Sequence, residues 1–221
     1  MGCSVRLKVG RGTPTRFRTG KRHYNFGMSE TEISTSNEFS LSGQLLIAMP
    51  NMLDPSFAGS VVYLCEHSDK GAMGLVINRP TDLDIQSLLE KIDVTVPDTL
   101  PAHFPVMMGG PVAAERGFVL HTEPLNWNSS LKVNDEISLT TSRDILEAVA
   151  RGDAPGKWLI TLGYAGWGEG QLEQELAQNA WLTVPANHTI LFDTPLEERF
   201  AGAYAMLGID PALMSGAAGH A

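Results

Sequence analysis

The sequence contains little cysteine and lacks any long apolar run. Its two cysteines, Cys3 and Cys65, can form one bridge at most, which excludes the disulfide framework of a small secreted domain. The longest apolar stretches, such as residues 158–162, are five or six residues long, whereas a transmembrane helix needs about 20. We therefore expect a protein of the reducing cytoplasm that does not span a membrane.

Acidic side chains are absent from residues 1–28, although seven of the sixteen lysines and arginines lie there. The remaining chain carries nine basic and twenty-five acidic residues, a net charge of −16. Residues 29–40 are rich in Ser, Thr and Glu and poor in apolar residues, which is typical of a linker. The sequence therefore predicts a basic extension and flexible linker over residues 1–40, one domain over 41–213 and a flexible tail over 214–221.

The basic extension has three interpretations: an organellar presequence, an arm that binds nucleic acid, or a segment translated from an upstream start codon. We favour the third, because Met28 opens the acidic part of the chain and the extension has no periodic apolar face. DNA binding requires basic side chains that neutralise phosphates. We expect no direct DNA binding by the acidic domain, and nucleic-acid binding through the extension alone stays an alternative.

Short runs of β-branched and aliphatic residues recur through the predicted domain, and they indicate strands. Helical patterns are too few and too irregularly placed for a repeating βαβ unit. We therefore predict an α+β fold with a mixed, mostly antiparallel sheet. The nine expected strands are residues 44–48, 60–65, 73–77, 106–108, 118–121, 136–140, 158–162, 181–184 and 189–192.

Four helices are expected between and after these strands. Residues 84–92 place apolar side chains at helical spacing, and 143–151 and 171–180 are two further helical segments. The last helix begins at Thr194-Pro195-Leu196-Glu197, which is typical of a capping box with proline at the first helical position. Gly208 and Pro211 are expected to end it.

Several sequence words in a fixed order between residues 43 and 181 resemble the YqgE/AlgH family of bacterial proteins, whose function is largely unassigned. The words are GQLLIAMP at 43–50, DPSF at 54–57, GLVINRP at 74–80, GGPV at 109–112, GFVLH at 117–121, GYAGWG at 163–168, QLE at 171–173 and NAW at 179–181.

This resemblance implies a compact α+β fold whose sheet is bent into a pseudo-barrel with about four flanking helices. It also implies a cytosolic location and carries a family label of transcriptional regulator. No catalytic residue can be transferred from the family. The extension before Met28 departs from the family pattern, which again favours a later start.

Three glycine-containing connections carry the candidate ligand-binding residues. The segment Gly163-x-x-Gly166-x-Gly168 follows an expected strand and precedes an expected helix, so we predict a tight turn there. An anion site formed by backbone N–H groups is the alternative. Trp167 is expected to pack over an edge of the core, with stacking on a ligand as the second interpretation.

The other two connections are Asn78-Arg79, before Pro80, and Gly109-Gly110, before Pro111. Arg79 ends a strand, where its cation either pairs with an acidic side chain or anchors a carboxylate or phosphate. The two glycines permit positive φ and set a turn between two strands.

Signatures of catalysis and metal binding are missing. There is no G-x-S-x-G, C-x₂-C or H-E-x-x-H, and Cys65 inside an apolar run should have a raised pKa. One alternative is a hydrolase that uses Cys65, His67 or His121, and Cys65 and His67, at i and i+2 of an expected strand, should face the same way. A zinc site from the same residues is a weaker alternative, and we expect no metal and no cofactor.

We therefore predict a non-catalytic regulatory or binding protein that acts through an unknown protein or small-molecule partner. The candidate ligand-binding residues are Asn78, Arg79, Gly109, Gly110, Gly166 and Trp167.

Overall fold

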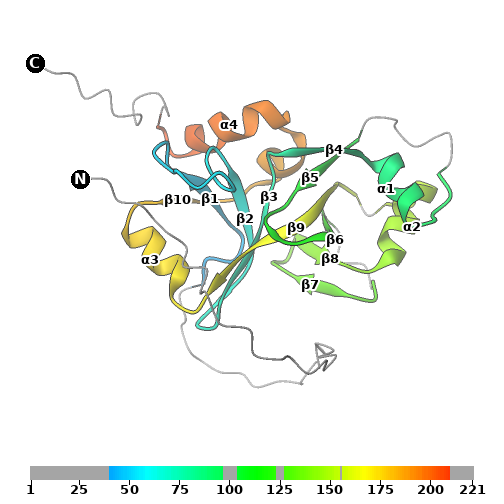
Figure 1. The fold of residues 1–221 in the computed structure, drawn as a ribbon, viewed down its shortest axis with the longest axis horizontal. Coiled ribbons are helices and arrows are strands. Elements are labelled where there is room, and N and C mark those ends of the chain that lie inside the picture. Colours follow the sequence, from blue (N-terminus) through cyan, green and yellow to red (C-terminus); the bar gives the residue numbers. More distant parts are fainter. Residues whose placement is uncertain (1–39, 97–103, 123–126, 155, 210–221) are drawn as a thin grey trace, which may run out of the picture. The chain divides into compact units, whose positions relative to one another are not determined.

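The computed structural model describes residues 40–96, 104–122, 127–154 and 156–209 (Figure 1). Most of the predicted extension and linker, and the whole predicted tail at 214–221, lie outside these residues. The strands are β1 (Gln44–Ala48), β2 (Val61–Ser68), β3 (Gly71–Val76), β4 (Pro80–Asp84), β5 (Pro105–Met108), β6 (Val112–Thr122), β7 (Ser130–Lys132), β8 (Ile137–Thr140), β9 (Trp158–Gly168) and β10 (Trp181–Pro185).

Four α-helices accompany the strands, together with a π-helical turn and a 3₁₀ turn. They are α1 (Ile85–Lys91), α2 (Arg143–Arg151), α3 (Gln171–Ala177), η1 (Thr189–Asp193), η2 (Leu196–Glu198) and α4 (Arg199–Met206). The side chain of Asp84 accepts a hydrogen bond from Ser87 N at 2.8 Å and so begins α1. Gly152, in the left-handed conformation, ends α2.

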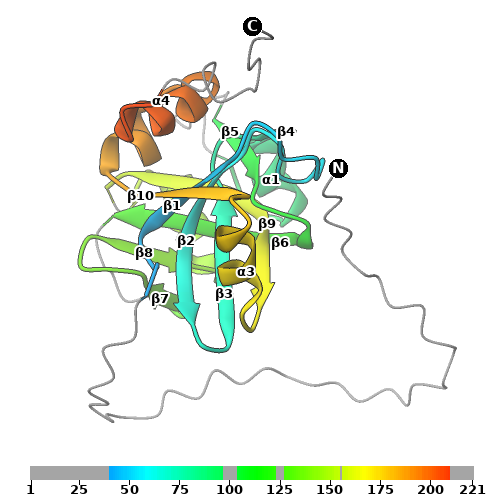
Figure 2. The same ribbon diagram turned by 90° about the vertical axis from the view of Figure 1, so that its left-hand side faces the viewer.

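The sheet runs in the order β10-β1-β2-β3-β9-β6-β8-β7, and β4 and β5 form a side branch on β9. Only the β5–β9 pairing is parallel among the pairs that the described strands form. The sheet curls into a half-barrel, with α3 and α4 near the β10–β1 end and α1 and α2 near β5, β6 and β9 (Figures 1 and 2). The predicted α+β class and the bent, mostly antiparallel sheet are confirmed.

Alternating residues along the strands supply three apolar clusters. In β1, Leu45 and Ile47 join the cluster on the inner face of the half-barrel, which α4 covers with Ala203 and Tyr204. Leu46 of the same strand points to a second cluster, which Leu172 of α3 covers. A third cluster packs the outer face of β5, β6 and β9 against α1 and α2. Each face of the sheet is therefore buried by a different set of helices.

Strand β9 joins the two parts of the sheet. Its first part pairs with β6 and, over Thr161 and Leu162, with β5, and its last four residues pair with β3. Gly163, with φ of +71°, lies where β9 changes partners. The predicted tight turn over residues 163–168 was therefore wrong: this glycine segment is strand. Glycine inside a strand here marks a close backbone approach.

That approach is made by the connection between β5 and β6. A Cβ atom on Gly110 would overlap the carbonyl group of Tyr164, and one on Gly163 would lie 2.5 Å from Gly110 O. Gly110 itself has φ of +152°. The turn predicted at Gly109 and Gly110 is present between the two strands, and backbone packing explains why glycine is needed there.

Three local predictions were wrong or incomplete. Residues 189–192, expected as a strand, form η1, because Asn187 Oδ1 accepts a hydrogen bond from Ile190 N at 2.9 Å and starts a helical turn. The capping box at Thr194 does not form, since its hydroxyl donates instead to Thr189 O at 2.9 Å. The last helix therefore begins with η2 and continues as α4. Strands β4 and β7 were not predicted.

We predict that Gly110→Ala lowers the free energy of unfolding by roughly 2–4 kcal/mol, since the new methyl group meets backbone atoms of Tyr164 that cannot move independently. Gly117→Ala in β6 is the matched control, because no atom lies within 4 Å of its added Cβ. Urea unfolding of both variants measures the difference. Equal stability of the two variants would contradict the close approach.

Candidate functional site

A pocket of about 240 Å³ lies where the β1–β2 loop, the end of β3 and the β5–β6 turn meet. Pro55 and Ser56 come from the loop, Arg79 follows β3, and Met108, Gly110 and Pro111 come from the turn and the strand before it. The pocket therefore combines two of the predicted site residues with four that were not predicted.

Arg79 is fixed by backbone carbonyl groups of the β1–β2 loop. Its Nη1 donates to Pro55 O at 2.9 Å and Ser56 O at 2.8 Å, and its Nη2 donates to Ala58 O. Among the described residues Arg79 forms no ion pair with a carboxylate. The expected partner for this cation, an acidic side chain, is thus replaced by three carbonyl oxygens, and the guanidinium keeps its net charge.

Asn78 closes the same loop from its other end. Its Oδ1 accepts a hydrogen bond from Val61 N at 2.9 Å, and its Nδ2 donates to Gly59 O at 2.9 Å. The side chain therefore replaces ladder hydrogen bonds where β3 ends. Asn78 supports the loop that forms one wall of the pocket.

The turn at Gly109 and Gly110 is bonded to strands on both sides. Gly109 O accepts from Val76 N at 2.8 Å, and Gly109 N donates to Leu162 O at 2.8 Å. The preceding Met108 N donates to Arg79 O at 2.8 Å. The backbone thus holds Arg79 and the turn together, and Gly110 lines the pocket.

Gly166 and Trp167 lie elsewhere. Trp167 is 6% exposed in the second cluster, stacks on Phe57 with ring centroids 6.1 Å apart, and donates from Nε1 to Glu175 at 2.9 Å. Neither residue lines the pocket. Trp167 contacts Phe57, which belongs to the same loop as the lining residues Pro55 and Ser56.

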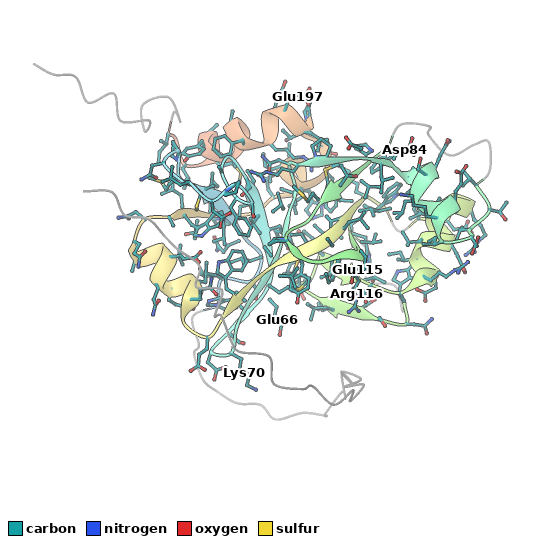
Figure 3. The ribbon with its side chains drawn as sticks, in the orientation of Figure 1. Glu66, Lys70, Asp84, Glu115, Arg116 and Glu197 are labelled. Carbon is teal, nitrogen blue, oxygen red and sulfur yellow. The ribbon has the colours of Figure 1, made fainter. Side chains whose placement is uncertain are left out.

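The structure separates Cys65 from His67. A β-bulge between Leu64 and Glu66 shifts the strand register, so Cys65 packs in the inner cluster, while His67 bonds to Leu41 N and Glu173 beside the second cluster. The expectation that both would face one way was wrong for this reason. Burial, helped by the charge of Glu66, which is labelled in Figure 3, raises the pKa of the Cys65 thiol.

His121 is fully buried on a different part of the sheet. Its Nε2 lies 2.8 Å from Thr140 Oγ1, which in turn lies 2.6 Å from Ser130 Oγ, and its Nδ1 faces Thr122 O at 3.1 Å. The structure therefore does not gather Cys65, His67 and His121 into one site. Within the described ranges no group of three or more His, Cys, Asp or Glu side chains is placed to hold a metal ion.

Sequence reasoning missed four lining residues, Pro55, Ser56, Met108 and Pro111. Met108 is 42% exposed at the end of an otherwise buried strand, and both prolines are exposed. The available signals were the place of Pro111 directly after the noted Gly109-Gly110 pair and the place of Pro55 in the sequence word DPSF. None of the helices in the described ranges is long and apolar enough to cross a membrane.

Comparison with known proteins agrees with this architecture. The family model described as AlgH-like matches residues 45–212. UPF0301 proteins of Burkholderia vietnamiensis and Burkholderia ambifaria are each 56% identical over 188 residues, which is 84% of this chain and 98% of the relative. The solution structure of the AlgH protein from Pseudomonas aeruginosa covers 88% of this chain and 100% of its own, with a TM-score of 0.69 and 48% identity.

A protein of Corynebacterium diphtheriae shares the fold at 20% identity, with a TM-score of 0.63, covering 81% of this chain and 93% of its own. The curled sheet with its loop-clamping arginine thus defines an α+β half-barrel protein with a pocket at one strand junction. The chain belongs to the AlgH-like family, as the resemblance of its sequence words predicted.

We predict that Cys65 does not react with a thiol reagent in the folded protein, because the buried thiol has a raised pKa and lacks solvent access. In a Cys3→Ser background, Ellman's reagent at pH 8 should label Cys65 only after urea is added. Rapid labelling without urea would contradict this burial and would revive the hydrolase alternative.

The Glu173 carboxylate should contribute pH-dependent stability. Its own backbone N–H and then His67 donate to it, which outweighs partial burial and lowers its pKa. A lowered pKa stabilises the folded state above the unfolded value, and this contribution is lost as pH falls through the folded value.

With half of the Glu173 side chain exposed, we expect Glu173→Gln to cost about 0.5–1 kcal/mol at pH 7 and almost nothing at pH 3. Urea unfolding at both pH values measures this, with exposed Glu169→Gln as the control. A cost that does not change between the two pH values would contradict the assignment.

Proposed function

We propose that this protein is a non-catalytic regulatory protein that binds a ligand or partner at the Arg79 pocket. The observation that carries the proposal is that Met108 lines the same pocket as a fixed guanidinium that pairs with no carboxylate of the described residues. Apolar side chains that line a pocket beside a polar anchor are typical of a binding site.

The chemistry of the lining supports binding over catalysis. Arg79 and Ser56 are the lining residues with polar side chains, and the lining contains no His, Cys, Asp or Glu. A general base and a matched acid are the usual requirements for hydrolysis or proton transfer. The pocket can hold an anion and an apolar group, but its own side chains offer no group with a suitable pKa.

Regulation of transcription, which the family label suggests, would then act through the bound ligand or partner. The chain after residue 28 carries a net charge of −16, and such a charge repels DNA phosphates. Under this proposal the domain regulates without binding DNA directly.

A fragment screen followed by ¹H–¹⁵N NMR tests the proposal. We expect binders to shift the amide signals of Ser56, Arg79, Met108 and Gly110, and Met108→Ser to weaken binding about fivefold or more by removing an apolar wall. Leu53→Ser is the matched control, since Leu53 is 81% exposed and does not line the pocket. Binders that cluster elsewhere, or turnover in a broad substrate panel, would contradict the proposal.

A further inference from the structure

The hydrogen bonds of Arg79 leave part of its guanidinium free. The group carries five N–H donors, and the three carbonyl oxygens of Pro55, Ser56 and Ala58 engage at most three of them. The Nε–H and at least one further N–H have no acceptor among the described residues. Nε–H and a neighbouring Nη–H form the fork that binds a carboxylate through both of its oxygens.

The fixed position of the fork favours binding. The carbonyl contacts already immobilise the long arginine side chain, so a ligand does not have to order it. No carboxylate within the described ranges lies close enough to pair with Arg79, and the nearby Asp54 side chain accepts from Ser56 N at 2.8 Å instead. Within the part of the chain that the structure describes, the charge of Arg79 is therefore not neutralised by a carboxylate and is available to an anion.

The charge of the surroundings discriminates between anions. The pocket lining contains one arginine, and residues 29–221 carry a net charge of −16. The single positive charge of Arg79 neutralises a monoanion. A phosphate dianion would keep one negative charge next to this acidic protein, which repels it. A carboxylate therefore fits the site better than a phosphate.

The walls of the pocket are apolar on both sides of the arginine. Pro55 lies in the loop, and Met108 and Pro111 lie on either side of the glycine pair. The volume of about 240 Å³ is below the range of roughly 300–1,000 Å³ that holds drug-sized molecules. An aliphatic chain or single ring attached to the carboxylate would shield the apolar lining residues from water and would still fit the volume of the pocket.

We propose that the Arg79 pocket is a receptor site for a small apolar monocarboxylic acid, whose carboxylate pairs with the free fork of Arg79 and whose apolar part lies against Pro55, Met108 and Pro111. This inference rests on the proposed function. It adds the chemical class of the ligand to the place of binding.

NMR titrations of the full chain with hexanoate test the inference. Hexanol, hexylamine and inorganic phosphate are the matched probes. We expect hexanoate to shift the amides of Arg79, Met108 and Gly110, with hexanol and phosphate at least tenfold weaker and hexylamine without effect. Equal affinity of hexanol and hexanoate, or tighter binding of phosphate, would overturn the inference.

Two variant pairs give a second test. Met108→Glu brings a competing carboxylate into the pocket and should abolish hexanoate binding, while Met108→Gln, which lacks the charge, should weaken it much less. Arg79→Lys keeps the charge but lacks the fork and should weaken binding at least fivefold. Arg116→Lys is its control, because Arg116 donates to Thr141 and lies outside the pocket lining. Unchanged binding in Met108→Glu would refute the site.

The outcomes separate this inference from the proposed function. If neutral probes bind the pocket as well as hexanoate does, the protein remains a binding protein, and the carboxylate assignment fails. If no probe of any charge perturbs the pocket residues, both fail.

Discussion

A contact between two backbone segments organises this protein. Gly109 and Gly110 lie against the carbonyl groups of Gly163 and Tyr164, where a side chain would collide. At this point β9 leaves β6 and joins β3, so the contact sets how the two parts of the sheet meet. Hydrogen bonds from Val76 N and to Leu162 O fix the same turn. The half-barrel depends on glycine at positions where backbone must approach backbone.

The pocket is a direct consequence of that junction. The missing side chains of Gly109 and Gly110 let the turn lie against β9. Residues of the turn and of the β1–β2 loop line the pocket together with Arg79. Its own carbonyl accepts from Met108 N, while its guanidinium holds the loop carbonyl groups. The same side chain therefore supports the loop and presents the charge of the pocket.

Eight of the nine strands and all four helices that local patterns predicted are present in the structure, because alternation and helical spacing reflect burial on one face. The patterns missed β4, whose Pro80 and two aspartates have poor strand propensity, and they misread residues 189–192, where the Asn187 side chain overrides an aliphatic run. Asn78, Arg79 and the glycine pair were selected from turn chemistry. Met108 was missed, since its exposure at the end of β5 arises from tertiary packing and leaves no local signal.

The loop that Arg79 clamps also reaches the opposite face of the sheet. Phe57 packs on Trp167 and, with centroids 5.5 Å apart, on Trp181, and both indole N–H groups donate to Glu175 Oε2. Three carbonyl groups near Phe57 are fixed by the guanidinium that an anion would share. In this way the loop that lines the pocket is joined by direct contacts to a buried aromatic cluster and to Glu175 of α3.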